Sequence, residues 1–189
     1  MANEMRFIEV ELKGLSYEEL DAKMRGLEFP QLSSLLNSRT TKVGDTAASL
    51  LIERGICNEL VDAMLNGCFT SKKGKIRALN VLNSFGCSCP RSHEGYKLFV
   101  LDRDADVVVS ALFGLVFLQD LGNLTYIREA MAKAEAGSTK IEFYNLAIQA
   151  LKEGNPFIYS PHFHDRRDVW GIDKNRFGHR VGSFNRREG

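Results

Sequence analysis

The sequence predicts an all-α fold in which helix hairpins stack on one another, and three observations support this prediction. Alanine recurs in successive helical segments as Ala47, Ala78, Ala111 and Ala147, at spacings of 31, 33 and 36 residues. Spacings of this size are typical of repeated helix pairs. A glycine follows each of these segments, and the stretches between them also have helical hydrophobic spacing. We therefore expect one hairpin for each repeated alanine.

Residues 1–40 are expected to form an irregular N-terminal cap on these repeats. The segment from Glu18 to Leu36 has helical hydrophobic spacing that Pro30 interrupts, which predicts a pair of short helices. Upstream of it, residues alternate in character between Phe7 and Leu12, and this period of two makes the run a strand candidate.

The repeats extend over residues 41–154, and a shared pattern defines the first helix of each. An apolar residue precedes the alanine by four positions in three of the four copies, and leucine follows it by four in all of them. Residues four apart share one helical face, so the small alanine lets a neighbouring helix approach while the larger residues fill the groove. Glycine then ends the helix in a left-handed conformation. The copies are Val43/Ala47/Leu51, Gly74/Ala78/Leu82, Val107/Ala111/Leu115 and Phe143/Ala147/Leu151, followed by Gly55, Gly86, Gly122 and Gly154.

A shorter second helix is predicted in each of the first three repeats. Asn58 to Leu65, Ser92 to Leu101 and Asn123 to Ala136 all place apolar residues at helical spacing. The last of these begins with an asparagine, a residue type that caps helix N-termini well. Each repeat is therefore expected to be a helix hairpin.

One segment resembles a known family. In the sequence DRDADVVVSALFGLVFL, acidic residues precede apolar and small residues at the spacing Val107, Ala111, Leu115 and Leu118. This segment resembles the first helix of a HEAT repeat, and the resemblance extends over about residues 41–154. It implies an α-solenoid of the compact HEAT-like variety, because the period is shorter than the ~40–47 residues of ordinary HEAT units. The arginine that the family has after the valine is Val108 here.

The composition changes after Gly154, and we expect residues 155–189 to form an irregular aromatic and basic extension that packs on the repeats or contacts a partner. From Ser160 onward seven Lys and Arg residues stand against four Asp and Glu, a net charge of +3, whereas the rest of the chain has −2. Arginines interleaved with aromatic residues can stack on bases or lie across a protein groove. The segment also holds side chains of metal-binding type at His162, His164, Asp165 and His179.

A histidine pair of the form His-x-His places both imidazoles on one side of an extended segment, as a divalent ion requires. Such residues also occur in plain loops, and the sequence shows no fourth ligand that must join them. The same histidines and arginines could supply a general base and an anion-binding group to a hydrolase. The motifs of nucleotide-binding loops, serine hydrolases and zinc proteases are absent, so we expect no cofactor and favour a protein that is not an enzyme.

Hydropathy argues against a membrane-spanning or secreted protein, and the charge balance gives no general attraction to nucleic acid. Twenty-five Lys and Arg residues balance 24 Asp and Glu, so no overall field attracts nucleic acid or anionic lipid. No uninterrupted apolar run approaches the roughly 18 residues of a membrane span, and the first residues lack the basic and apolar blocks of a secretory signal. We expect a cytoplasmic protein.

The cysteines support the same expectation. Four cysteines are too few for a disulfide framework in a chain of 189 residues and suit a reducing compartment. Cys57 and Cys68 are expected to act as small hydrophobic residues near helix ends. Cys87 and Cys89 lie one residue apart and lack the spacing of a zinc knuckle, so we expect thiols there as well.

A cluster of cations is the clearest candidate for an anion site. Lys72, Lys73, Lys75 and Arg77 lie at the expected start of the Ala78 helix, where the helix dipole disfavours positive charge. Free N–H groups and four cations can hold a phosphate or an acidic surface. The alternative is a solvated face in which these cations pair with Asp102, Asp104 and Asp106 of the next repeat, which is the commoner situation.

Three functions are compatible with this sequence. We favour a module that binds a protein partner on a concave surface formed by the second helices, for example an inhibitor or immunity protein that covers a toxin's active site. The alternatives are a nucleic-acid-binding or DNA-repair protein, which the HEAT-like resemblance implies, and a hydrolase or metal protein. Aromatic residues and arginine dominate binding hot spots, and the candidate contacts are Tyr96, Tyr126, Arg128, Lys133, Arg166, Arg167 and Trp170.

Overall fold

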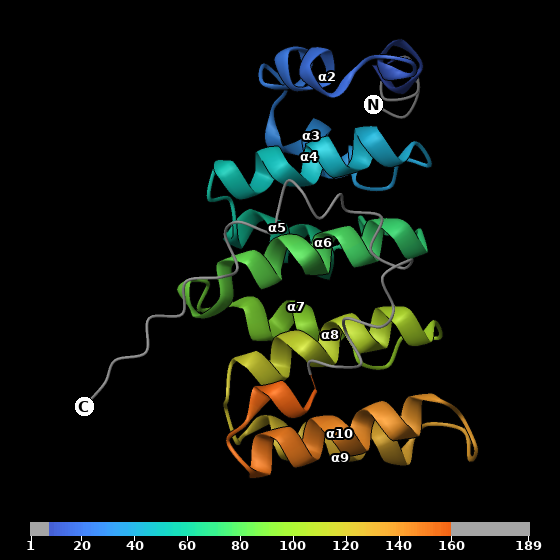
Figure 1. The fold of residues 1–189 in the computed structure, drawn as a ribbon, viewed down its shortest axis with the longest axis vertical. Helices are drawn as coiled ribbons and strands as arrows, with labels where there is room; N and C mark the ends of the chain where they lie inside the picture. The colour runs from blue at the N-terminus through green and yellow to red at the C-terminus, as the bar shows by residue number, and fades with distance from the viewer. Residues whose placement is uncertain (1–7, 160–189) are drawn as a thin grey trace.

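The computed structural model describes residues 8–159, and within that range the fold is all-α, as predicted. No strand occurs in the described residues. The helices are stacked along the long axis of the molecule, from α2 at one end to α10 at the other (Figure 1).

Four long helices form one layer of the stack, the long-helix layer. They contact one another in chain order, so that α4 contacts α6, α6 contacts α8 and α8 contacts α10. Each contains one of the repeated alanines. Their bounds are α4 Thr41–Glu53, α6 Lys72–Phe85, α8 Ala105–Phe117 and α10 Lys140–Lys152.

The shorter helices form a second layer, the short-helix layer, behind the first in Figure 1. In this layer α3 contacts α5 and α5 contacts α7, while α3, α7 and α9 each pack on the long helix that follows them. The 3-10 turn η1 (Gly86–Ser88) follows α6, and η2 (Pro156–Ile158) packs on α10. The short helices are α3 Phe29–Leu35, α5 Asn58–Leu65, α7 Ser92–Phe99 and α9 Asn123–Ala132.

The N-terminal region contains the predicted pair of short helices but not the strand candidate. Residues 8–12 are helical, because Ile8 and Leu12 are four apart and turn to the same side, where Leu12 is buried. A capping box then starts α2 (Tyr17–Met24), in which Ser16 Oγ accepts from the Glu19 N–H at 3.3 Å and Glu19 Oε2 accepts from the Ser16 N–H at 2.7 Å. Pro30 lies in the first turn of α3, where its missing N–H costs nothing.

The repeated alanines are all fully buried, as the sequence predicts. Ala47, Ala78, Ala111 and Ala147 each have 0% relative exposure. A second small residue serves the same purpose in α8, since a Cβ on Gly114 would lie 2.2 Å from the ring of Tyr96 in α7. Close approach of the two layers therefore depends on small side chains on the long helices.

An asparagine and a glycine replace apolar packing where the turn after α3 meets the start of α6. Asn37 Nδ2 donates to the Cys68 carbonyl at 2.9 Å, and Asn37 Oδ1 accepts from Ser71 Oγ at 3.2 Å. A Cβ on Gly74 would lie only 2.2 Å from that Asn37 Oδ1. This explains why the α6 copy of the pattern has glycine where the other copies have a large apolar residue.

Two details of the helix ends differ from the prediction. Gly55, Gly86 and Gly154 have the expected positive φ, but Gly122 has φ −59° and serves as the N-cap of α9. After α8 the left-handed position is occupied by Gln119, with φ 51°, whose Nε2 donates to the Val116 carbonyl at 2.5 Å. Asn123 is not the predicted cap: it is the first residue of α9, fully buried, and no hydrogen-bond partner reaches its side-chain amide.

The cysteines also differ from the prediction. Cys57 and Cys89 form a disulfide that links the start of α5 to the turn before α7, so these two residues are not thiols in this structure. Cys68 is free and exposed rather than a buried hydrophobic residue. Sequence spacing gave no sign of the pair, because 32 residues separate its members and only the stacking of two hairpins brings them together.

Within the described part of the chain, no helix combines the length and the apolar character that crossing a membrane requires.

Candidate binding surfaces

The four clustered cations at the start of α6 are divided between two neighbouring helices. Lys72 Nζ lies 3.1 Å from Asp104 Oδ2 and also pairs with Asp106, and Lys75 Nζ lies 2.5 Å from Asp102 Oδ2. The hydrogen bonds to Asp106 and Asp104 raise the pKa of Lys72 above its ordinary value. These contacts are the pairing with the next repeat that the sequence offered as the alternative to an anion site.

Arg77 turns the other way and is buried against α4. Its Nε donates to Asp45 Oδ1 at 2.9 Å, and its exposure is 4%. Its terminal nitrogens donate to the carbonyl oxygens of Leu36 at 2.9 Å, Ser38 at 2.8 Å and Thr41 at 3.3 Å. With its donors engaged in this way, Arg77 ties the turn before α4 to α6 and is not available to an external anion.

The buried pair of Arg77 and Asp45 is closely packed and shielded from solvent. Burial raises the pKa of Asp45, and the charge of Arg77 acts in the opposite direction. Asp45 Oδ2 is buried and has no hydrogen-bond partner. A Cβ on Gly44 would lie 2.2 Å from the guanidinium carbon, so glycine at this position makes room for the arginine.

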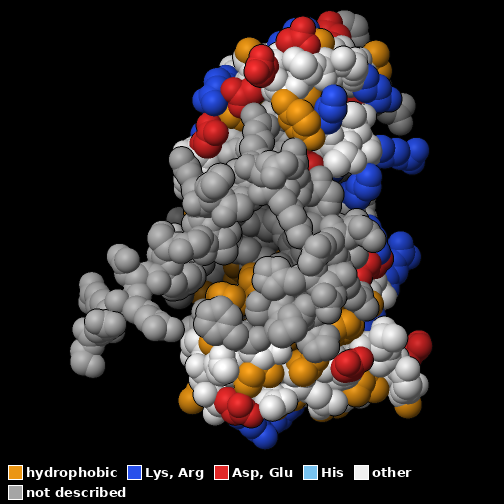
Figure 2. All heavy atoms as spheres, viewed as in Figure 1, with side chains coloured by type: hydrophobic (Ala, Val, Ile, Leu, Met, Phe, Trp, Pro, Cys, Tyr) orange, Lys and Arg blue, Asp and Glu red, His pale blue; other side chains and the backbone are white. Residues whose placement is uncertain are grey.

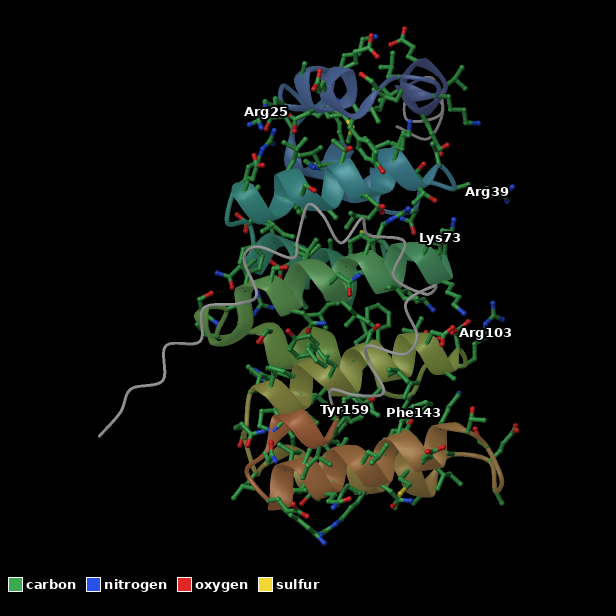
Figure 3. All side chains as sticks on the ribbon, viewed as in Figure 1. Arg25, Arg39, Lys73, Arg103, Phe143 and Tyr159 are labelled. Carbon is green, nitrogen blue, oxygen red and sulfur yellow. A yellow bond between two sulfur atoms is a disulfide. The ribbon has the colours of Figure 1, made fainter. Side chains whose placement is uncertain are left out.

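Lys73 is the member of the cluster that remains accessible. It is exposed and makes no ion pair in the described residues, although its Nζ lies 3.5 Å from Thr41 Oγ1. Two further cations, Arg39 and Arg103, occupy comparable places before α4 and α8 and project from the same edge of the stack (Figure 3). Anion binding at this edge stays a prediction, and its candidate contributor is Lys73 rather than Arg77.

The candidate contact residues on the second helices differ in their exposure to solvent. Tyr96 is 1% exposed and packs against Gly114, so it belongs to the core and not to a binding surface. Tyr126 is half-buried, and its hydroxyl donates to the Lys97 carbonyl at 2.6 Å. Arg128 and Lys133 are exposed. The structure therefore corrects Tyr96 and brings no aromatic cluster together on the short-helix layer.

The remaining candidates lie outside the described residues. These are the expected contacts Arg166, Arg167 and Trp170 and the metal-binding types His162, His164, Asp165 and His179. Among residues 8–159 no group of three or more histidine, cysteine, aspartate or glutamate side chains is arranged to hold a metal ion.

The outer face of the long-helix layer is a surface that the sequence did not single out. Positions two before and two after a repeated alanine lie on the opposite side of the helix, since two residues turn the chain by about 200°. The contacts of α6 with its neighbours agree with this: Arg77 faces α4, Lys72 and Lys75 reach the start of α8, and Leu82 lies beside Gly95 of α7. The side of α6 that none of these contacts occupies is the side opposite Ala78. We call this surface the long-helix face, formed by Asp45, Ser49, Ile76, Asn80, Val109 and Phe113.

Four of the six residues of the long-helix face are buried and two are half-buried, although the face points away from the short-helix layer. Ile76, Asn80 and Val109 are 4%, 8% and 3% exposed, whereas the equivalent positions of α10, Asn145 and Gln149, are exposed. Its one charged residue is Asp45, which is paired with Arg77. A helix face turned to water normally carries charged side chains.

The short helices follow that normal pattern. Their exposed positions include the charged residues Glu59 and Asp62 in α5 and Arg128 and Glu129 in α9. The contrast separates the two layers: the short-helix layer presents charged side chains to solvent, whereas the long-helix face carries no charge other than that of Asp45. A sequence signal for it existed, because residues 76–85 contain no charge other than Arg77 and residues 107–119 contain none.

Buried amides without partners lie on the same side of α6. Both side-chain polar atoms of Asn80, and both of Asn83 one turn further on, are buried and without a hydrogen-bond partner. An amide group offers a donor and an acceptor, which is the complement of a peptide group. Figure 1 shows the long-helix layer in front, and Figure 2 shows the same view with all heavy atoms as spheres.

Comparison with known proteins gives no match: no protein-family model, no curated protein and no solved structure is significantly similar to this chain.

Proposed function

We propose that this chain is a binding module of HEAT-like repeats, arranged as an α-solenoid, that holds a polypeptide segment on its long-helix face. The observation that carries the proposal is the apolar and amide character of that face, whose one charge is that of the paired Asp45, at positions that point away from the short-helix layer. The regular contacts of α4, α6, α8 and α10 support the repeat assignment. In this proposal the binding face is formed by the first helices of the hairpins, not by the second helices that the sequence favoured.

The chemistry of the face favours a polypeptide over a small charged ligand. Ile76, Val109 and Phe113 offer apolar contact, while Asn80 and Asn83 offer paired donors and acceptors. Leaving such a buried amide unpaired costs about 1–3 kcal/mol, so an occupant that pairs with it gains stability. A peptide backbone with apolar side chains satisfies both requirements. An inhibitor or immunity protein would use such a face to hold a segment of its target.

Matched charge variants test this proposal. Asn83→Arg puts a charge on the α6 side of the face, whereas Leu98→Arg puts the same charge on α7, at a leucine that is 43% exposed. Each tagged variant is expressed in the native host, and the amount of any stoichiometric polypeptide that co-purifies is measured. We expect Asn83→Arg to reduce that amount by about tenfold or more and Leu98→Arg to leave it unchanged. Equal loss in both variants, or none in Asn83→Arg, would overturn the proposal.

Nucleic-acid binding is the second candidate, and one observation favours it. Arg39, Lys73 and Arg103 project from one edge of the stack, at the starts of three successive long helices (Figure 3). Such a row can track a phosphate backbone. If it does, the affinity for duplex DNA falls steeply with salt, and replacing all three residues by alanine lowers the salt slope by about 0.9 per lost phosphate contact. Affinity for DNA that does not change with salt would exclude this candidate.

A further inference from the structure

A concave pocket lies where the turn between α7 and α8 meets the connection between α9 and α10. Its volume is about 350 Å³, which is within the range of small-molecule sites. The lining comes from the turn after α7, from the end of α9 with the residues that follow it, and from the first turns of α10. No residue of the long-helix face lines it, so the pocket is separate from the surface proposed above to bind polypeptide.

The inner wall of the pocket is apolar. Ala130 of α9 and Tyr144 of α10 are 2% and 1% exposed, and the half-buried Ala134 completes this wall. The Tyr144 hydroxyl donates to the Val100 carbonyl at 2.5 Å, so the tyrosine offers the pocket its ring and not its polar end. Burial raises the pKa of Tyr144 to about 12, and the phenol is therefore neutral at ordinary pH. This wall suits a ligand with an apolar part.

Three cations line the same pocket, and none of them makes an ion pair with the described residues. They are Arg103, Lys133 and Lys140. Lys140 is half-buried, and its Nζ donates to the Asp102 carbonyl at 2.7 Å. An ammonium group has three donors, so two of those of Lys140 remain for a ligand. A lysine partly removed from water is normally paired with an anion.

The carboxylates of the lining do not balance these cations. Asp102 is already engaged, because its Oδ2 lies 2.5 Å from Lys75 Nζ and its Oδ1 accepts from the Asp104 N–H at 2.9 Å. The other carboxylate of the lining is that of Glu135, which is exposed. Three unpaired cations therefore stand against one carboxylate, and the pocket attracts an anion.

We propose that this pocket binds a small organic acid, whose carboxylate or phosphate group is held by the three unpaired cations and whose apolar part lies against the inner wall. Ser138 adds a hydroxyl to the lining: its Oγ accepts from the Lys140 N–H at 3.3 Å and keeps its own O–H as a donor. The site is independent of polypeptide binding on the long-helix face, so either proposal can fail without the other.

Backbone amide chemical shifts of the isotopically labelled full-length protein locate the site and measure its affinity. The probes are hexanoate and hexyl phosphate, with hexanol as the neutral counterpart and inorganic phosphate as an anion without an apolar part. We expect both acids to shift the Ser138 and Lys140 signals, with an affinity that falls as salt is added. Hexanol and inorganic phosphate should bind at least about threefold more weakly than hexyl phosphate. Equal affinity for either of them, or no shift with the acids, would overturn the proposal.

Charge variants of both signs test the same residues. Replacing Arg103 and Lys133 together by Gln should weaken hexyl phosphate binding about tenfold, whereas Glu135→Gln should strengthen it about twofold. A variant that has lost its fold cannot show that gain, and circular dichroism checks the helices of each. Arg128→Gln is the matched control, at an exposed cation of α9 outside the lining, and should change nothing. Unchanged affinity in the double variant, or an equal loss in Arg128→Gln, would contradict the proposal.

Arg103 also belongs to the row of cations considered above for nucleic acid, and one further variant separates the two uses. Replacing Arg39 and Lys73 together by Gln removes the rest of that row but leaves the pocket lining intact. Hexyl phosphate binding should be unchanged in this variant. If it weakens as much as in the variant of Arg103 and Lys133, the cations act as one phosphate-binding row and the pocket is not a separate site.

Discussion

Helix α6 is connected to its two neighbours in the long-helix layer by cations of the same cluster, yet the two connections differ in kind. Toward α4, Arg77 is buried and pairs with the buried Asp45. Toward α8, the side chain of Lys72 is 47% exposed where it pairs with Asp104 and Asp106. An exposed pair competes with water and salt, whereas a buried charge that loses its partner cannot be solvated. The comparison shows that a run of cations in sequence is not one site, because position around the helix decides the environment of each.

Removing the buried cation is expected to have the largest effect. Arg77→Ala leaves Asp45 buried without its partner and frees three backbone carbonyls, which should lower the free energy of unfolding by about 3–5 kcal/mol. Urea denaturation monitored by circular dichroism measures it. A loss no greater than that of Lys72→Ala would show that the two connections do not differ.

The covalent link between hairpins gives a second and independent measure. The Cys57–Cys89 disulfide spans 32 residues of sequence, and closing a loop of that size is worth about 2–4 kcal/mol. Cys89→Ser should lower the unfolding free energy by this amount in oxidising buffer. The wild type and the variant should become similar when a reductant is added. Identical stability in oxidising buffer would mean that the disulfide does not form in solution.

A double-mutant cycle sharpens the comparison at α4. Gly44→Ala places a Cβ about where the Arg77 guanidinium lies, 2.2 Å from it, and should cost about 1–3 kcal/mol by displacing that group from its partners. In the Arg77→Ala background the same substitution should cost nothing or stabilise the helix by up to about 1 kcal/mol, since alanine is the better helix former. Additive effects of the two substitutions would contradict the packing described here.

The exposed Lys72, which pairs with Asp104 and Asp106 at the start of α8, should give the smallest effect. Lys72→Ala is expected to change the unfolding free energy by about 0.2–1 kcal/mol, and this difference should shrink as salt is added. Because the pKa of Lys72 is raised in the folded state from 10.5, its contribution is complete below pH 10.5 and is lost as the pH rises beyond that value. Stability curves of wild type and Lys72→Ala should therefore converge in alkaline solution. A difference that persists there would assign the effect to the lysine's methylene chain.

The sequence anticipated the local architecture well. The bounds of α5 agree with the predicted helix over Asn58 to Leu65, the pair of short N-terminal helices is present, and the repeated alanines are buried. These features depend on patterns between residues three or four apart, which a single helix already expresses. The strand candidate before Leu12 was wrong because a short run of apolar residues also fits one helical turn.

The candidate sites were predicted less well, and Tyr96 and Arg77 illustrate why. Both are residue types of binding surfaces, and both are buried against a glycine of a neighbouring helix, Gly114 and Gly44 respectively. Sequence gives the type of a residue and its face on its own helix. It does not give the neighbour that the face will meet.

The sequence by itself determined that this chain forms helices, the places of the shorter ones to within a few residues, and which small residues allow them to approach. Tertiary structure alone decided that Asn37 takes the space left by Gly74, that Cys57 meets Cys89, and that Arg77 is buried while Lys73 is exposed. Helical periodicity is a short-range property fixed by hydrogen bonds four residues apart. Contacts between residues about thirty positions apart depend on how one layer sits on the next, which no local pattern encodes.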